Sequence, residues 1–236
     1  MDKKNWLNYW NEKNIWIESE LLKKNTEIFY QKTSNIFNYN KKNVVLEIGC
    51  GNGDFANKIS SKVGEIYCLD TSQVSINICK NNILKKDNVK ILKLNKNYTD
   101  LSFLENKKFS IIIFNSVVQY YKSQMEIIDL VKSVKKIATK DARFLISDIV
   151  VTNDKIKKYG KLIYNSISNG YFVPLMKISL RLIVDMKYSN FQKKQPCLIV
   201  NINKLIEDLS VFAKNITIVN ENLTVNPDRK HLLVQF

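Results

Sequence analysis

One stretch of the sequence decides the fold: Val44-Val45-Leu46-Glu47-Ile48-Gly49-Cys50-Gly51-Asn52-Gly53-Asp54-Phe55. It begins with a short apolar run, typical of a buried parallel strand, and continues with three glycines at alternate positions. Residues 55–59 then have the spacing of an amphipathic helix. Glycine permits a sharp turn and a close approach of a ligand to the main chain, and a helix start offers free N–H groups. The order of strand, glycine turn and helix therefore predicts a ligand-binding turn.

The spacing of the glycines narrows the class of ligand. A dinucleotide-binding fingerprint would need a glycine where Asp54 stands, and a P-loop would end in G-K-[ST], which is absent here. The pattern E-x-G-x-G-x-G that is present resembles the first motif of the class I S-adenosylmethionine (SAM)-dependent methyltransferases. The resemblance implies cofactor contacts from Glu47, Gly49, Cys50, Gly51, Asn52 and Gly53. For this motif alone, a glycine turn in a plain α/β domain remains the alternative.

A second apolar run, residues 65–70, ends in Asp70. An acid at the end of the second strand of a Rossmann-like sheet can accept hydrogen bonds from both ribose hydroxyls of an adenosine, because a carboxylate is an acceptor only. The family holds an acid at this position, and Thr71 and Ser72 should cap the next helix. We therefore expect Asp70, Thr71 and Ser72 at the cofactor, although an acid at a helix start with no ligand would look the same.

Short β-branched runs alternate with helical patterns along the chain, which predicts parallel strands joined by right-handed crossovers. The expected strands are Val44–Ile48, Ile66–Leu69, Val89–Leu94, Phe109–Phe114, Ala142–Val151, Ile216–Val219 and His231–Phe236. The expected helices are Glu18–Phe37, Val74–Leu84, Met125–Thr139 and Ile202–Phe212. With the resemblance, this predicts an α/β fold: a Rossmann-like, seven-stranded, mostly parallel sheet flanked by helices, with its last strand antiparallel.

The same resemblance implies a single methyltransferase domain over residues 1–236. Residues 1–42 would form an N-terminal helical cap and residues 43–151 the SAM-binding core. Residues 152–200 have no place in the minimal fold and resemble the substrate lid that such enzymes insert before the last helix. Residues 201–236 would supply the closing helix and strands.

The fourth strand is followed by Asn115-Ser116-Val117-Val118-Gln119-Tyr120-Tyr121, which is similar to the fourth motif of small-molecule methyltransferases. Ligands of open parallel sheets bind at the carboxyl ends of the strands, so we expect Asn115, Ser116 and Val117 at the cofactor. Ser110 departs from the aspartate that is usual in the family. After the third strand, where the family places an acid or amide against the adenine, the candidates are Asn95, Lys96 and Asn97.

The sequence offers no convincing general base. Methyl transfer depends mainly on in-line positioning, and a base is needed only when the acceptor must lose a proton. The candidates are Gln119, Tyr120, Asp148 and His231, so the catalytic residues stay undecided. Gln119 and Tyr120 can equally be residues of a helix start, Asp148 a capping residue, and His231 a structural histidine.

Aromatic residues crowd the N-terminus, with Trp6, Tyr9 and Trp10 at helical spacing and Trp16 beyond them. These rings either dock the helix on the core or roof the cofactor site, as N-terminal helices do in several members of the family. The expected substrate residues are Tyr9, Trp10, Trp16, Tyr120, Tyr121 and Arg181.

Composition sets further limits. The net charge is +15, but the lysines are spread along the chain, which favours a solvated surface, then an anionic small substrate, and disfavours nucleic acid. One histidine and four cysteines without a C-x-x-C pair speak against a metal site, and we expect reduced thiols. No secretory leader and no membrane-spanning run is recognisable, so we expect a cytoplasmic protein.

Taken with these features, the resemblance implies a SAM-dependent methyltransferase that acts on O or N of a small molecule, with S-adenosylhomocysteine as a product. Anionic acceptors, such as phosphorylated or sugar-nucleotide intermediates, are the first candidates. An RNA or protein methyltransferase is the alternative, although an N-P-P-Y or D-P-P-Y motif is missing after the fourth strand. A non-catalytic SAM-binding or scaffold protein is the second alternative.

Overall fold

Strand β1 (Val44–Ile48) lies inside a seven-stranded sheet whose order is β3-β2-β1-β4-β5-β7-β6 in the computed structural model. The other strands are β2 (Glu65–Asp70), β3 (Val89–Lys93), β4 (Phe109–Asn115), β5 (Ala138–Ile149), β6 (Asn215–Ile218) and β7 (Lys230–Gln235). Strands β1 to β5 are parallel, and β7 runs antiparallel to both of its neighbours, β5 and β6. The structure describes residues 6–12, 16, 19–83, 86–95, 97–152, 155–184 and 195–236. The predicted Rossmann-like sheet with an antiparallel last strand is confirmed.

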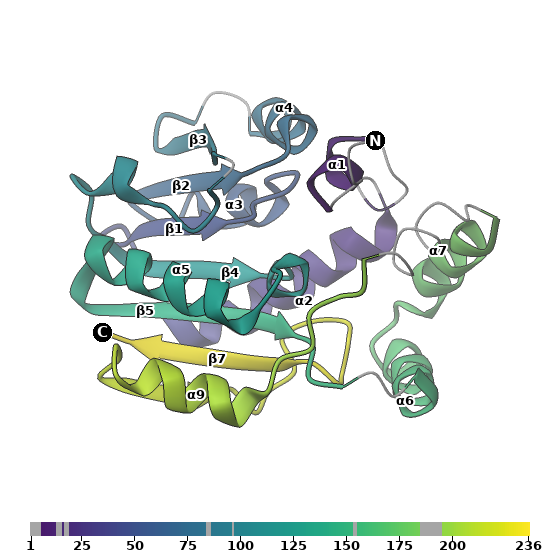
Figure 1. Cartoon of the computed structure of the whole chain (residues 1–236). Coiled ribbons are helices and arrows are strands. Elements are labelled where there is room, and N and C mark those ends of the chain that lie inside the picture. Colours follow the sequence, from purple (N-terminus) through teal and green to yellow (C-terminus); the bar gives the residue numbers. More distant parts are fainter. Residues whose placement is uncertain are drawn as a thin grey trace, which may run out of the picture.

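Helices cover both faces of the sheet because successive side chains of a buried strand point to opposite faces. In β1, Val45 belongs to the cluster that packs against α2 (Glu20–Phe37), α3 (Asp54–Ile59) and α4 (Gln73–Asn82). Leu46 belongs to the opposite cluster, which packs against α5 (Gln124–Ile137) and α9 (Ile202–Ser210). The two apolar layers hold the carboxyl ends of the parallel strands at one edge of the sheet (Figure 1).

Three further helices lie beyond that edge, at the right of Figure 1: α1 (Trp6–Asn11), α6 (Lys155–Ser168) and α7 (Phe172–Val184). α1 contacts α4, and α7 contacts α2 and α6. Two 3₁₀ turns, η1 (Ser102–Leu104) and η2 (Val118–Tyr120), flank β4. None of the described helices is both long enough and apolar enough to cross a bilayer.

The boundary between α5 and β5 differs from the prediction. The helix was expected to run to Thr139 and the strand to begin at Ala142, but α5 ends at Ile137 and β5 begins at Ala138. Ala138 already pairs with Phe109 of β4, and the register shifts before the pairing resumes at Ile111. The strand therefore begins directly after the helix, without a loop.

Candidate functional site

The glycine turn joins β1 to α3 and is fixed by backbone hydrogen bonds to the end of β2. The N–H groups of Gly49 and Cys50 both donate to the Leu69 carbonyl, at 2.7 and 2.9 Å. A Cβ on Gly49 would meet the side chain of Val117 at 2.3 Å, so the turn lies directly against the chain that leaves β4. A Cβ on Gly51, where φ is +52°, would have no heavy atom of the described residues within 4 Å. The main chain at Gly51 therefore borders open space.

Asp70, at the end of β2, ties the glycine turn to the start of α4. One carboxylate oxygen accepts from the Gly51 N–H at 2.9 Å, and the other accepts from the Ser72 N–H at 2.8 Å. Ser72 caps α4 as expected, because its hydroxyl accepts from the Ser75 N–H at 3.1 Å. Burial raises the pKa of the Asp70 carboxyl. Each carboxylate oxygen has two lone pairs, so both oxygens keep acceptor capacity beyond these bonds.

Two acceptor atoms at the ends of β1 and β4 lack hydrogen-bond partners among the described residues. Glu47 is buried, its Oε2 atom has no partner, and burial raises the pKa of its carboxyl well above the usual range. The Oδ1 atom of Asn115 is also buried without a partner. Glu47 pairs in register with Ile113, which places it two residues before Asn115 along the paired strands. Unpaired buried acceptors cost about 1–3 kcal/mol each, so the pair marks a place for a ligand with donors.

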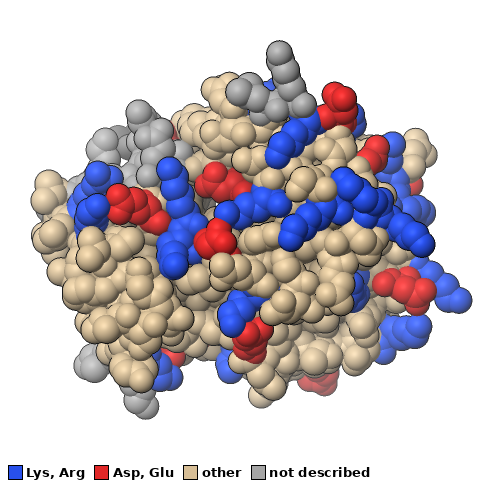
Figure 2. Space-filling model, turned by 180° about the vertical axis from the view of Figure 1, so that it is seen from behind, with Lys and Arg blue, Asp and Glu red and all other residues tan. Residues whose placement is uncertain are grey.

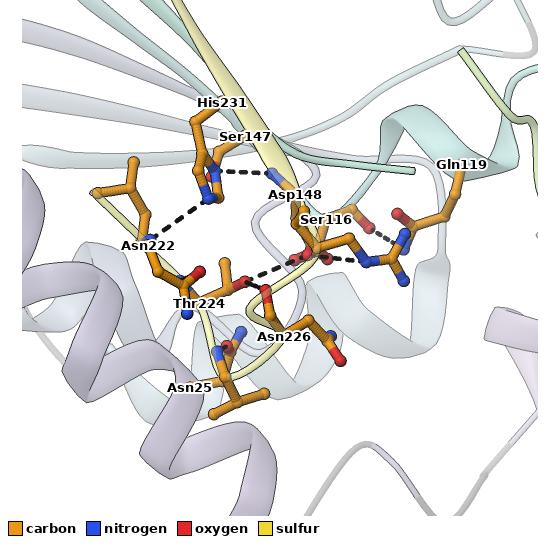
Figure 3. Close-up of polar contacts among 12 residues, drawn as sticks. Asn25, Ser116, Gln119, Ser147, Asp148, Asn222, Thr224, Asn226 and His231 are labelled. Atoms are coloured by element: carbon orange, nitrogen blue, oxygen red, sulfur yellow. Dashed lines mark hydrogen bonds and ion pairs between the residues drawn. The ribbon is translucent and has the colours of Figure 1, made fainter. Parts of the chain in front are cut away.

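The chain after β4 turns sharply at Ser116, whose φ is +60°. The Ser116 N–H donates to the Ser147 carbonyl at 3.2 Å, and its own carbonyl accepts from Gln119 Nε2 at 2.9 Å. Gln119 is buried, and its Oε1 atom has no partner among the described residues. In Figure 3 the Gln119 side chain projects from η2 toward the end of β5, where Asp148 lies. Gln119 Oε1 is thus a third buried acceptor at this edge that has no hydrogen-bond partner among the described residues.

An aromatic cluster covers this edge. The Tyr120 ring lies 4.7 Å from that of Trp6 and 5.8 Å from that of Trp10, measured between centroids. The Tyr9 ring packs edge-on against Trp10 at 5.4 Å, and Trp16 contacts the same cluster. The Ser72 hydroxyl donates to the Trp10 carbonyl at 2.8 Å, which docks α1 on the start of α4. α1 therefore bridges the two loops that follow β2 and β4.

A polar network lies at the end of β5 (Figure 3). Asp148 has a φ of +63° and is buried, and its Oδ1 atom accepts from the Thr224 hydroxyl at 3.3 Å. The same oxygen lies 3.4 Å from Nε of Arg229, whose side chain is 13% exposed. The Nη1 atom of Arg229 is buried without a partner among the described residues. The Arg229 guanidinium is therefore ion-paired through Nε, and its Nη1 atom keeps N–H groups that no described residue accepts.

His231 belongs to the same network but is held by the main chain. Its Nδ1 atom lies 2.8 Å from the Ser147 hydroxyl and accepts from the Asp148 N–H at 3.2 Å. The Leu223 N–H points at Nε2, at 3.3 Å. Burial, together with the charges of Lys230 and Arg229, lowers the pKa of His231 to about 4. The ring is therefore neutral at pH 7.

Tyr121, Asn95, Lys96, Asn97 and Arg181 were also expected at the site. Tyr121 turns into the core, where its ring packs against Phe114 at 5.4 Å, and burial raises the pKa of its hydroxyl. Asn95 and Asn97 follow β3 and are exposed, and Arg181 is exposed on α7. Lys96 lies outside the described residues. The part of the chain that the structure describes contains no group of His, Cys, Asp and Glu suited to a metal ion.

Sequence reasoning missed Arg229 and Thr224. The predicted antiparallel last strand could have indicated Arg229, because the start of such a strand must lie beside the end of the parallel strand with which it pairs. Ile149 indeed pairs with Lys230, which places Arg229 at the end of β5.

Comparisons with known proteins bear on the family and the fold of this chain. The family model of a methyltransferase domain matches residues 39–212. A search of curated proteins gave no significant match. Among solved structures, the pyocyanin biosynthetic protein PhzM superposes with a TM-score of 0.58 at 8% identity, over 89% of this chain and 55% of that one. This chain therefore spans little more than half the length of PhzM.

Two further structures share the fold. The N-methyltransferase NodS from Bradyrhizobium japonicum WM9, in complex with S-adenosylhomocysteine, has a TM-score of 0.54 at 10% identity, over 93% of this chain and 88% of that one. Phosphoethanolamine N-methyltransferase 1 of Haemonchus contortus has a TM-score of 0.52 at 12% identity, over 62% of this chain and 31% of that one. From its family model and its fold, the chain belongs to the class I SAM-dependent methyltransferases.

Proposed function

We propose that this methyltransferase acts on a small anionic acceptor, which it methylates on O or N beneath the aromatic cluster of α1. One observation carries the proposal: buried polar atoms without partners gather where β1, β4 and β5 end. They are Glu47 Oε2, Asn115 Oδ1, Gln119 Oε1 and Arg229 Nη1, all counted among the described residues. Native proteins leave few such atoms unpaired, so ligands are the expected partners.

The residues at the glycine turn fit SAM. The cofactor carries a ribose diol and an ammonium group, and both are hydrogen-bond donors. Asp70 keeps acceptor capacity for the diol, and Glu47 and Asn115 offer the unmet acceptors that an ammonium group would satisfy. The open main chain at Gly51 admits a ligand that touches the backbone. We assign Gly49, Cys50, Asn52, Gly53, Thr71, Ser72, Ser116 and Val117 to the lining of the same site.

The acceptor would lie under the rings of α1. SAM supplies a methyl group on a positively charged sulfur, and the protein must hold the acceptor in line with it and exclude water. Trp10 and Tyr120 pack face to edge over this region, and the Trp10 Nε1 atom is buried without a partner among the described residues. We propose that Tyr9, Trp10, Trp16 and Tyr120 form the roof. Residues 1–42 would then act as the cap and residues 152–200 as the substrate lid.

Arg229 supports an anionic acceptor. Its Nε atom is paired with Asp148, and its buried Nη1 atom offers a second N–H direction that a phosphate or carboxylate oxygen can use. Among the structural neighbours, the enzyme from Haemonchus contortus is by name a methyltransferase of phosphoethanolamine, a phosphorylated amine. Arg181, exposed on α7, is the second candidate for this contact.

The acceptor must already be nucleophilic. His231 has a pKa of about 4, and its ring faces main-chain donors. Asp148 is engaged by Arg229 and Thr224. Side chains such as Gln119 and Tyr120 can orient the methyl acceptor, but they are weak bases. An amine bound in its neutral form, whose lone pair attacks directly, or an acidic hydroxyl, which ionises readily, fits this site.

The test is an assay of S-adenosylhomocysteine formation with phosphorylated amines, sugar nucleotides and their uncharged counterparts. We expect turnover with anionic acceptors only. Arg229→Lys keeps the charge beside Asp148 but removes the forked donor, so it should raise KM for the acceptor and leave the affinity for S-adenosylhomocysteine unchanged. If Arg181→Gln raises KM and Arg229→Lys does not, the anion contact belongs to α7. Equal turnover of neutral acceptors would refute the anionic class.

A further inference from the structure

The amide group of Gln119 is held in one orientation by the turn that follows β4. Its Nε2 atom donates to the Ser116 carbonyl at 2.9 Å, and the Gln119 carbonyl accepts from the Leu198 N–H at 2.9 Å. Exchanging the two ends of the amide would set Oε1 against the Ser116 carbonyl, which is another acceptor. Gln119 is 8% exposed, and Oε1 is the end without a partner among the described residues. A ligand that reaches this atom must therefore bring an N–H or O–H group.

An unpaired donor lies beside the same strand ends. The Ser116 N–H donates to the Ser147 carbonyl at 3.2 Å, so the chain that leaves β4 lies next to Asp148 at the end of β5. The Gln119 amide is anchored on Ser116, and Figure 3 shows its side chain projecting toward Asp148. Asp148 is paired with Nε of Arg229, whose Nη1 atom is buried without an acceptor among the described residues. A hydrogen-bond acceptor and a cationic donor, both unpaired, thus lie near Asp148.

The anionic group that Arg229 can hold is small. The Arg229 side chain is 13% exposed and its Nη1 atom is buried, so an anion must enter the interior to reach it. On the face of the molecule shown in Figure 2, Lys and Arg are scattered among Asp and Glu, so that face has no one-sided charge to attract a large polyanion. A carboxylate, sulfonate or phosphate group on a small molecule matches these conditions.

Of an amine and a hydroxyl, the amine can donate to Gln119 and react without a base. The lone pair of a neutral amine forms the N–C bond, the C–S bond of SAM breaks with its electron pair left on sulfur, and the resulting ammonium releases one proton to water. A hydroxyl must instead lose its single hydrogen to a base, and an amide oxygen is too weak a base to take it. Nearby, His231 is held by main-chain N–H groups, and Asp148 is engaged by Arg229.

We propose that Gln119 Oε1 accepts a hydrogen bond from the nitrogen that this enzyme methylates, and that the acceptor is an amine that carries an anionic group. This inference rests on the proposed function, to which it adds the reacting atom. Positive charge develops on the nitrogen as the N–C bond forms, and the fixed amide dipole of Gln119 stabilises it. The Arg229 guanidinium would hold the anionic group of the same molecule. Gln119 then selects amines over alcohols.

Three pairs of acceptors that differ only in an amino or a hydroxyl group test the proposal: glycine with glycolate, taurine with isethionate, and phosphoethanolamine with ethylene glycol phosphate. Formation of S-adenosylhomocysteine and the mass of the methylated product are measured for each compound. Glycinamide, which lacks the carboxylate of glycine, tests the anionic class separately. The test variant is Gln119→Met, which keeps the length of the side chain and removes the amide. The matched control is Gln124→Met, because the Gln124 amide, on α5, donates to Asp208 at 3.2 Å.

We expect methylation of an amine in these pairs and of no hydroxyl partner. Gln119→Met should lower kcat/KM for that amine by about 10- to 100-fold. Calorimetry should show that the same variant binds the amine more weakly when saturated with S-adenosylhomocysteine, although its affinity for S-adenosylhomocysteine is unchanged. Gln124→Met should behave as the natural protein does.

Methylation of a hydroxyl partner, methylation of no amine, or an unchanged kcat/KM in Gln119→Met would overturn the assignment of Gln119 and leave the proposed anionic class standing. An equal loss of affinity for S-adenosylhomocysteine in Gln119→Met would assign the residue to the cofactor and would also overturn it. Equal turnover of glycinamide and glycine would instead overturn the anionic part of the inference together with the proposed function.

Discussion

Replacing Gly51 with alanine separates the ligand-binding role of the glycine turn from its structural role. The φ angle of Gly51 is +52°, and an added Cβ would meet no heavy atom of the described residues within 4 Å. Gly170, between α6 and α7, has the same two properties, with a φ of +69° and no atom within 4 Å. Gly170→Ala is therefore a matched control, since it adds the same methyl group in the same backbone region away from the site.

The expected effects differ between stability and binding. An L-residue in the left-handed region costs about 1–2 kcal/mol, so both variants should melt roughly 2–8 °C lower. If a ligand occupies the space over Gly51, the new methyl group overpacks the complex by about 1–3 kcal/mol, which weakens binding by about 5- to 150-fold. Titration calorimetry with S-adenosylhomocysteine measures this affinity. Gly170→Ala should bind as the natural protein does.

Two results would refute the reasoning. If Gly51→Ala binds S-adenosylhomocysteine with unchanged affinity while melting as low as Gly170→Ala, the open space at the turn is not where the ligand approaches. If both variants lose affinity equally, the loss reflects general destabilisation and not the position of Gly51.

Asp70→Ala should weaken S-adenosylhomocysteine binding by about tenfold or more, because hydrogen bonds to a charged group contribute about 1.5–3 kcal/mol; unchanged affinity would move the ribose contact elsewhere. Trp10→Ala should raise KM for the acceptor in steady-state kinetics, whereas a fall in melting temperature alone would assign the ring to the core. His231 should make stability depend on pH. Its pKa of about 4 lies below the unfolded value near 6.5, so the unfolded chain binds the proton first and stability falls as pH drops through this window, by about 3 kcal/mol. In urea unfolding at several pH values, the free energy of unfolding of His231→Gln should depend less on pH than that of the natural protein. An equal dependence would contradict the assignment of this pH effect to His231.

The sequence predicted the sheet because strands buried on both faces read as uninterrupted apolar runs. β1 occupies the predicted residues Val44–Ile48, and the capping role of Ser72 is also confirmed. The ends of helices were predicted less accurately where pairing between strands overrides the local preference for helix. Ala138 illustrates this, since its pairing with Phe109 across the sheet begins β5 inside the predicted helix.

The candidate site could be predicted only where a motif carries it. Asp70 stands in a recognisable place, and its bond to the Gly51 N–H joins two motifs that are adjacent only in space. Arg229 escaped attention because its partner, Asp148, is distant in sequence. Tyr121 looked equivalent to Tyr120, yet the end of η2 sends the first ring to α1 and the second into the core.

The most direct test of the central claim is thermal unfolding of the purified protein with and without S-adenosylhomocysteine, with NAD and ATP as controls. A ligand at a hundred times its dissociation constant stabilises the folded state by about 2.7 kcal/mol, or roughly 5–11 °C for a domain of this size. We predict a shift of this order with S-adenosylhomocysteine and none with NAD or ATP. No shift, or a shift with NAD in its place, would contradict the assignment of the glycine turn to SAM.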